Sequence, residues 1–297
     1  MTSDSDSKMH EQRSIIWHPK QQILIMGFCL IIIVSIILVI FEMGFWLTEY
    51  PAHPSSLEPF QVDAVVFIIL GSYAGHPIGD MALEALHRGG QKEQGQRGGG
   101  WHGLVFVLTD RPACFQQAAD LHFTQVIEVP SQTSAIKIKA IKTEIFSYLP
   151  KDIETVMYLD SDVVVTQPLD NFLSDLALAE HSWTAQHFGK HWEMAMFPDR
   201  ESHTFGVCLK CNEWHTGVMI MKRGPSNSCL KAWGQELNSK TYGRDQHAFE
   251  QVRASGACKD ILSLPAGHLL FMKDLLSVAV LPNLRTFAHY TRAAVLN

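Results

Sequence analysis

The sequence lacks any concentrated group of basic residues. Its 297 residues include 24 Lys and Arg against 30 Asp and Glu, so the net charge is −6 at pH 7. The basic residues form no stripe, and a basic stripe or patch is the electrostatic signature of nucleic-acid binding. The sequence therefore predicts no nucleic-acid partner. An anionic ligand would have to be met by a metal ion or by individual cations.

Polar side chains are almost missing from one long run near the N-terminus. Ser35 is the only one between Ile23 and Phe41. At about 1.5 Å per residue, a helix of this length crosses a hydrocarbon core of about 30 Å. A buried core helix would show a polar face, and a cleaved signal peptide would have a shorter run with an Ala-x-Ala-like site after it. We therefore predict a permanent transmembrane anchor over residues 21–48.

The flanking charges predict the orientation of this anchor. Lys8, Arg13 and Lys20 precede it, whereas no Lys or Arg lies between Phe41 and Phe60. The positive-inside rule then makes residues 1–20 a cytosolic tail and places the rest of the chain outside the cell or in a lumen. Residues 49–61 are rich in proline and suit a short extended stem. Residues 62–297 form the predicted globular domain.

The cysteines after the anchor leave two arrangements open. They are odd in number, so a monomer keeps at least one unpaired. The chain also has no Asn-x-Ser/Thr site for glycosylation. One cluster has a spacing that tetrahedral zinc accepts: His203, Cys208, Cys211 and His215. On an oxidising side of the membrane, a Cys-x-x-Cys pair also enters disulfides. The sequence offers Cys229 or Cys258 as partners for such bonds.

The globular part alternates between strand-like and helical segments, which predicts an α/β domain with a mainly parallel sheet. Two helices are expected, over Met81–Arg88 and from about Ile138 to Leu149. Four segments are expected strands: Val62–Leu70, Leu104–Leu108, Gln125–Val129 and Thr155–Leu159.

Lys142 occupies an unusual position on the second of these helices. At 100° per residue it falls within the apolar face that Ile138, Ile141 and Ile145 define. A lysine that points inward is costly unless an anion meets it. The alternative is a lysine whose stem is buried and whose charged head reaches solvent.

Asp160-Ser161-Asp162 directly follows the fourth predicted strand. Ligands of open α/β sheets bind beyond the carboxyl ends of the strands, and residues i and i+2 of an extended chain project to the same side. Two carboxylates placed in this way can hold one hard cation and leave coordination positions for diphosphate oxygens. Two other interpretations remain, namely turn aspartates and the nucleophile of a haloacid-dehalogenase-type phosphatase.

The context of the acidic pair favours the metal interpretation over the phosphatase. The phosphatase motif opens its domain on the first strand, whereas here three expected strands come before the strand that leads into Asp160. A phosphatase also needs a later acidic cluster, and the segment that contains Asp245 and Gln246 has no second acidic residue.

The motif and its surroundings resemble family 8 glycosyltransferases, the group that includes glycogenin and bacterial lipopolysaccharide galactosyltransferases. The core of the resemblance is Tyr158-Leu159-Asp160-Ser161-Asp162-Val163-Val164-Val165, preceded by Leu149-Pro150. Three further pieces follow in the order of the family: His215-Thr216-Gly217-Val218-Met219-Ile220-Met221, then Asp245-Gln246, then His289-Tyr290. The resemblance runs from about Val62 to the C-terminus and is strongest from Lys137 to Met221.

The resemblance implies a GT-A fold, a UDP-sugar donor, Mn²⁺ (or Mg²⁺) and retention of the anomeric configuration. It implies that Asp160, Asp162 and His289 bind the metal. Gln246 would lie beside the anomeric carbon, and Asp245 would orient the sugar or the acceptor. The implied donor-binding residues are Tyr73, which would stack on uracil, with Lys142, Ser161, His215, Thr216 and Gly217.

Two positions depart from the family pattern. The family usually has Asn where His215 stands, which leaves the identity of the sugar open. It also continues from His-Tyr into Gly-x-x-Lys-Pro-Trp, whose lysine binds diphosphate, whereas this chain has Thr291-Arg292 at that point. Arg292 is the candidate replacement for the lysine.

The sequence as a whole thus predicts a type II protein of the Golgi (or endoplasmic reticulum) membrane with a lumenal catalytic domain. Its acceptor would be a glycan or a glycoprotein. The alternatives are the phosphatase and a catalytically silent lumenal glycan-binding protein.

Overall fold

The computed structural model describes residues 57–88, 100–116, 123–132, 134–198, 213–265, 268–272 and 286–290. The chain separates into two units, Met1–Ser55 and Ser56–Asn297, and all the described residues belong to the second. The predicted tail, the anchor and most of the stem lie outside the described residues, as do Arg292, His203, Cys208 and Cys211. Within the described ranges, no helix has both the length and the apolar character that crossing a bilayer requires.

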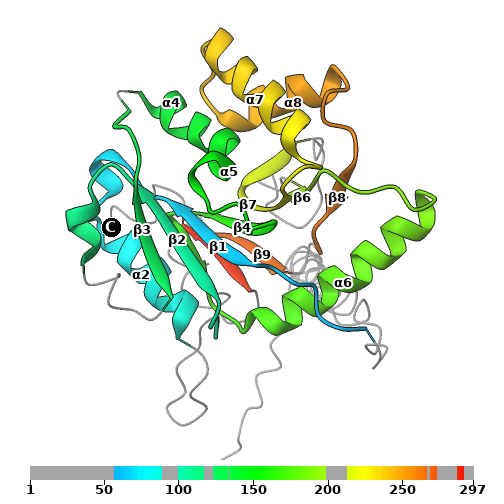
Figure 1. The fold of residues 1–297 in the computed structure, drawn as a ribbon, viewed down its shortest axis with the longest axis horizontal. Helices are drawn as coiled ribbons and strands as arrows, with labels where there is room; N and C mark the ends of the chain where they lie inside the picture. Colours follow the sequence, from blue (N-terminus) through cyan, green and yellow to red (C-terminus); the bar gives the residue numbers. More distant parts are fainter. Residues whose placement is uncertain are drawn as a thin grey trace, which may run out of the picture. The chain divides into compact units, whose positions relative to one another are not determined.

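A seven-stranded sheet forms the centre of the second unit (Figure 1). Its strands lie in the order β3-β2-β1-β4-β7-β6-β8. The first four of these run parallel, β7 is antiparallel to both of its neighbours, and β8 is parallel to β6. The bounds are β1 Ala64–Ile68, β2 Leu104–Thr109, β3 Thr124–Glu128, β4 Thr155–Asp160, β6 Met194–Pro198, β7 Trp214–Lys222 and β8 Ile261–Ser263. The four strands predicted from sequence are confirmed, with small differences at their ends.

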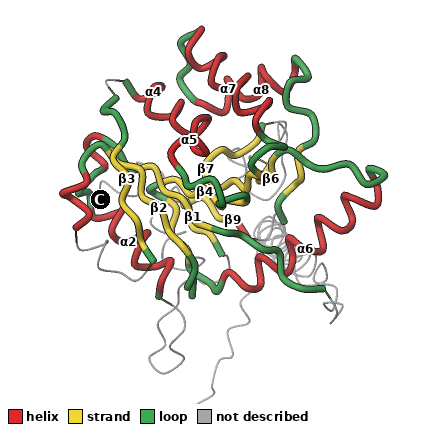
Figure 2. The backbone as a smooth tube through the Cα atoms, in the orientation of Figure 1, coloured by secondary structure: helices red, strands yellow, loops and turns green. Residues whose placement is uncertain are grey.

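Helices cover both faces of the sheet (Figures 1 and 2). On one side lie α2 (Pro77–His87) and α6 (Leu169–Gln186), and on the other lie α4 (Ala135–Ala140), α5 (Ile145–Tyr148), α7 (Asn227–Ser239) and α8 (Asp245–Ala254). Alternate residues of each strand point to opposite faces, so the sheet separates two cores. In β1, Val65 and Phe67 belong to one core, and Ala64 and Val66 belong to the other.

Both predicted helices need correction. The first starts earlier than expected, at Pro77, because proline suits the first turn and the His76 ring accepts a hydrogen bond from the amide of Ile78 (3.2 Å). The second is not continuous. It consists of α4, a 3₁₀ turn η4 (Ile141–Glu144) and α5. Short 3₁₀ turns η1 (Gly71–Tyr73) and η3 (Pro112–Phe115) follow β1 and β2.

A small second sheet brings the C-terminal part of the chain back to the acidic motif. Its strands lie in the order β5-β10-β9, with bounds Val163–Val165, Phe287–Tyr290 and Leu269–Met272. β10 is antiparallel to β5 and parallel to β9. In this register His289 lies opposite Val163, the residue that follows Asp162.

Cys229 and Cys258 form a disulfide between the first turn of α7 and the segment after α8. Both are fully buried. The expected pairing of Cys208 or Cys211 with either of them is therefore wrong, because each already has its partner. Among the described cysteines Cys114 is free, and it is exposed.

Candidate active site

A cavity of about 400 Å³ opens beside the carboxyl ends of β1 and β4. This volume lies within the usual range for small-molecule sites. The cavity is lined by all the sequence-predicted site residues that the structure describes: Tyr73, Lys142, Asp160, Ser161, Asp162, His215, Thr216, Gly217, Asp245, Gln246 and His289. Residues far apart in the sequence are thus brought to one place by the two sheets.

Asp160, Asp162 and His289 form a group whose ligand atoms all lie within 4.8 Å of one another. The imidazole Nε2 of His289 is 3.2 Å from Oδ1 of Asp162. Burial alone would lower the pKa of His289, but its hydrogen bond to Asp162 raises it. Two carboxylates and one imidazole at the rim of an open cavity fit a divalent cation that keeps coordination positions for a ligand.

Gly217 lets the backbone of β7 approach the acidic motif closely. A Cβ atom at this position would lie 2.8 Å from Oδ2 of Asp160 and 2.6 Å from Cε1 of His215. Contacts this short do not occur between real side chains. Any residue larger than glycine would therefore displace Asp160 or His215.

Lys142 points into the cavity wall and not toward solvent, so the interpretation of a solvent-reaching head is wrong. Its Nζ lies 2.8 Å from Asp160 Oδ1 and 2.9 Å from Asp245 Oδ2, and it donates to the carbonyl oxygen of Thr216 at 3.1 Å. Burial by itself would lower the pKa of Lys142, but the two carboxylates raise it above its usual value. The ammonium group thus links the acidic motif on β4 to the start of α8.

Asp245, the first residue of α8, accepts hydrogen bonds from three side chains. Lys142 and Lys139 donate at 2.9 and 2.8 Å, and the hydroxyl of Thr216 donates at 3.0 Å. Burial would raise the pKa of Asp245, but the two lysines hold it well below its ordinary value. The carboxylate is therefore ionised at neutral pH and is suited to orienting its neighbours. Gln246, the next residue, is also buried at the cavity.

The contact between His215 and His289 was not predicted from the sequence. Nε2 of His215 and Nδ1 of His289 share a hydrogen bond of 2.9 Å. Burial and the neighbouring His289 hold the pKa of His215 well below its usual value, so its ring is neutral. Besides lining the cavity as expected, His215 therefore fixes the ring orientation of His289. No sequence signal predicts this contact, because the partners are 74 residues apart.

Three further polar residues at the cavity were also missed, namely Tyr158, Lys139 and Arg244. The hydroxyl of Tyr158 donates to Oδ1 of Asp160, and burial together with Asp160 raises the pKa of this phenol. Strand alternation indicates this pair, since Tyr158 precedes Asp160 by two residues and faces the same side. Lys139 lies one helical turn before Lys142 and therefore on the same side of the helix, so its position at the cavity could also have been predicted from the sequence.

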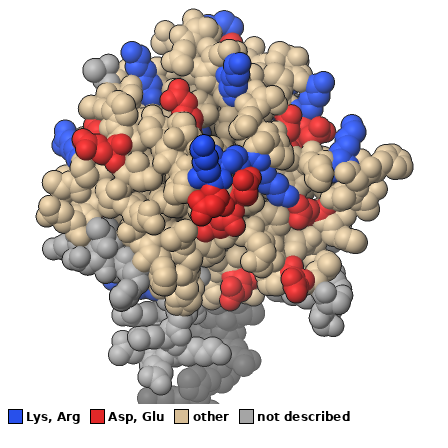
Figure 3. All heavy atoms as spheres, in the orientation of Figure 1, with Lys and Arg blue, Asp and Glu red and all other residues tan. Residues whose placement is uncertain are grey.

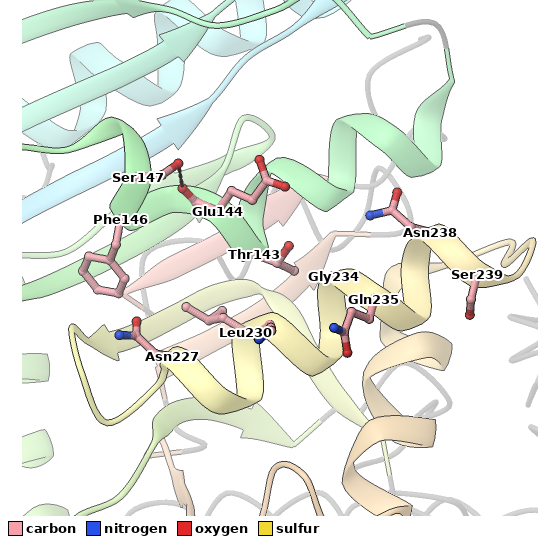
Figure 4. Close-up of a pocket in the computed structure, with 11 residues that line it drawn as sticks. Thr143, Glu144, Phe146, Ser147, Asn227, Leu230, Gly234, Gln235, Asn238 and Ser239 are labelled. Atoms are coloured by element: carbon pink, nitrogen blue, oxygen red, sulfur yellow. Dashed lines mark hydrogen bonds between the residues drawn. The ribbon is translucent and has the colours of Figure 1, made fainter.

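A larger groove of about 760 Å³ lies elsewhere, between α7 on one side and η4 with α5 on the other (Figure 4). Hydroxyl and amide side chains line it, with Glu144 as the one carboxylate among its lining residues. It therefore lacks the grouped carboxylates of the first cavity.

On the face shown in Figure 3, acidic and basic side chains are interspersed.

No protein-family model matches the sequence, and no curated protein matches it. Solved structures do match. The apo form of the glycosyltransferase GlyE of Streptococcus pneumoniae TIGR4 has a TM-score of 0.50 at 16% identity, over 78% of this chain and 55% of the GlyE chain. The match therefore spans about half of GlyE.

Two other matches have lower TM-scores. The galactosyltransferase LgtC, solved with donor and acceptor sugar analogs, gives 0.44 at 16% identity over 76% of this chain and 86% of its own. Mouse xyloside xylosyltransferase 1 gives 0.44 at 11% identity over 79% and 99%. At these identities the comparisons show the fold alone, so the chain has a mixed α/β fold that it shares with GlyE.

Proposed function

We propose that this protein is a metal-dependent, retaining glycosyltransferase of family 8. It would move a hexose or pentose from a UDP-sugar to a glycan or glycoprotein acceptor. The observation that carries the proposal is the convergence of Asp160, Asp162 and His289 in one cavity at the carboxyl ends of parallel strands. The fold shared with the glycosyltransferase GlyE supports it.

Asp160, Asp162 and His289 would hold the Mn²⁺ (or Mg²⁺). When bound, the ion supplies positive charge that stabilises the departing diphosphate of UDP. Lys142 holds Asp160 through its 2.8 Å ion pair, and His215 holds His289. The ligands are thus oriented before the donor arrives, which is the arrangement that metal sites use to fix geometry and affinity.

The remaining cavity residues would bind the donor and support the transfer. By its match to the family, Tyr73 stacks on uracil, while Ser161, Thr216 and Gly217 approach the sugar and the diphosphate. The amide oxygen of Gln246 faces positive charge that develops at the anomeric carbon. The bond from this carbon to the diphosphate breaks, the acceptor oxygen bonds to it from the same side, and the acceptor proton passes to the departing phosphate oxygen. Asp245 orients this region while ionised.

We also propose that the protein is a type II membrane protein of the Golgi (or endoplasmic reticulum). The apolar run within residues 21–48 and the basic residues before it support this placement. The buried disulfide between Cys229 and Cys258 suits an oxidising compartment.

The test uses the full chain, purified in detergent, with a panel of UDP- and GDP-sugars. We expect release of UDP from one donor, dependent on Mn²⁺ and abolished in Asp162→Asn, which keeps the side-chain shape but removes the charge. Absence of metal-dependent turnover with every donor would overturn the proposal. Release of phosphate from a generic ester, with an acyl-phosphate at Asp160, would indicate the phosphatase instead. Metal-independent glycan binding that survives Asp162→Asn would indicate a binding protein.

A further inference from the structure

The position of His289 depends on the register of a very short strand. β10 has four residues, and its pairing with β5 sets His289 opposite Val163 and Phe287 opposite Val165. A shift by one residue would turn every side chain of β10 to the other face of the small sheet. His289 would then leave Asp162. Something must therefore fix this register.

A chain of buried hydrogen bonds holds the residue that precedes β10. The hydroxyl of Thr286 and Nδ1 of His268 are 2.6 Å apart, and Nε2 of His268 is 2.7 Å from Oδ2 of Asp175 on α6. His268 and Thr286 are 4% and 3% exposed. The carbonyl oxygen of Thr286 also accepts a hydrogen bond from the amide of Thr166 (2.8 Å), directly after β5. Thr286 is thus held through both its side chain and its backbone.

Apolar packing at the same place is less selective. The ring of Phe287 meets those of Phe172 and Phe197 with centroids 4.9 and 6.1 Å apart, and the His268 ring packs edge-on against Phe172 at 5.3 Å. These contacts place β10 against the core. The hydrophobic effect is non-directional, however, whereas hydrogen bonds weaken steeply when their length or angle changes. The polar chain therefore defines the position of β10 along its own axis more narrowly than the rings do.

We propose that the chain Asp175–His268–Thr286 sets the register of β10 and thereby positions His289 at Asp162. His268 and Thr286 are positioning residues, because they touch neither the cavity nor its ligands and act through β10. What His289 does once positioned rests on the proposed function. The register itself does not, since it follows from contacts among α6, β5, β10 and His268, the residue before β9.

The most informative substitutions are at Thr286, made in the full chain. Thr286→Val keeps the shape of the side chain but removes the hydroxyl, and Thr286→Ser restores it. His268→Phe keeps the ring that packs on Phe172 and removes both hydrogen bonds. The control is Leu237→Ala, which opens a cavity in the core beneath α7, away from β10. Two quantities are measured: hydrogen-exchange protection of the β10 amides, and the affinity for Mn²⁺ alone by titration calorimetry.

We expect Thr286→Val and His268→Phe to lose protection at β10 and to bind Mn²⁺ roughly tenfold to a hundredfold more weakly, because the third ligand is misplaced. Thr286→Ser should recover both quantities. Leu237→Ala should have a lower free energy of unfolding and yet bind Mn²⁺ within about twofold of the wild type. A cavity at this distant site destabilises the fold without moving the metal ligands.

The outcomes separate the two proposals. If the wild type binds no Mn²⁺, the metal-dependent function fails, and protection at β10 still decides the question of register. If the wild type binds Mn²⁺ and Thr286→Val matches it in both measurements, the positioning role is wrong while the function stands. Equal loss of Mn²⁺ affinity in Leu237→Ala would show general destabilisation and would also overturn the role. If Thr286→Val fails to fold, His268→Phe is compared with Thr286→Ser instead. The first removes the hydrogen bonds and the second keeps them, so the comparison is the same.

Discussion

Lys142 and Asp245 form a buried ion pair, with 2.9 Å between Nζ and Oδ2 and 5% of each side chain exposed. The same ammonium lies 2.8 Å from Oδ1 of Asp160. One lysine thus balances the carboxylate at the start of α8 and the first carboxylate of the acidic motif. Removing one partner of a buried pair is costly because it leaves a charge without compensation.

Replacement of Lys142 by Met should therefore lower the free energy of unfolding by about 3–5 kcal/mol. In the double variant Lys142→Met/Asp245→Asn the loss should be clearly smaller than the sum of the two single losses, because fewer uncompensated charges remain. Urea unfolding followed by circular dichroism measures both. Additive losses would show that the two side chains do not interact.

The pH dependence of stability should carry a contribution from Asp245. Lys142 and Lys139 hold its folded-state pKa below the unfolded value of about 3.9. The stabilisation is therefore fully present above about pH 5 and is lost as the pH falls toward the folded-state pKa. The difference in unfolding free energy between the wild type and Asp245→Asn should shrink from pH 6 to pH 3. A constant difference over that range would contradict the lowered pKa.

Gly217→Ala should damage metal binding more than stability. The added Cβ would meet Asp160 Oδ2 at 2.8 Å and would force that carboxylate or His215 to move. We expect Mn²⁺ affinity to fall by about tenfold or more, as titration calorimetry would show. Gly79→Ala in α2 is the matched control, because its Cβ would make only ordinary contacts with Ile69 (3.4 Å) and the carbonyl oxygen of Tyr73 (3.9 Å) and would meet none of the proposed metal ligands. If Gly217→Ala left the Mn²⁺ affinity unchanged, β7 would be able to move away from Asp160 and His215 at little energetic cost.

The disulfide between Cys229 and Cys258 should stabilise the fold. Replacing both cysteines with alanine should cost about 2–5 kcal/mol. Peptide mapping without reduction should find these two cysteines linked and Cys114 alkylated in the folded protein, since it is exposed. A link from Cys229 or Cys258 to Cys208 or Cys211 would contradict the structure.

The sequence predicted the parts of this fold that depend on local pattern. Strands β1, β2 and β4 are largely apolar runs, and the inward direction of Lys142 follows from its angle among Ile138, Ile141 and Ile145. The break of that helix at η4 was not predicted, because the apolar spacing continues through it. Its 3₁₀ turn places both Lys139 and Lys142 within reach of Asp245.

The contacts that the sequence did not reveal join distant segments. His215 meets His289 across 74 residues, and Asp175 meets His268 across 93. Neither pair has a spacing that marks it, because the approach depends on how β7, α6 and the small sheet pack. Asp160 and Asp162 were predicted as metal ligands from their position after a strand, whereas His289 was named through a family resemblance. The distance from His289 to the two aspartates is a property of the tertiary structure alone.

The charges that line the cavity imply an order of events. Asp160, Asp162 and Asp245 carry three negative charges, and Lys139, Lys142 and Arg244 carry three positive ones, so these six side chains have no net charge. The raised pKa of His289 adds positive charge while its ring is protonated, and a ring that binds a metal ion is neutral. A divalent cation bound there leaves an excess of two positive charges. The attraction for an anionic ligand is therefore strongest after the cation has entered. We therefore expect ordered binding, in which the metal precedes the nucleotide and the nucleotide's association rate increases with metal occupancy.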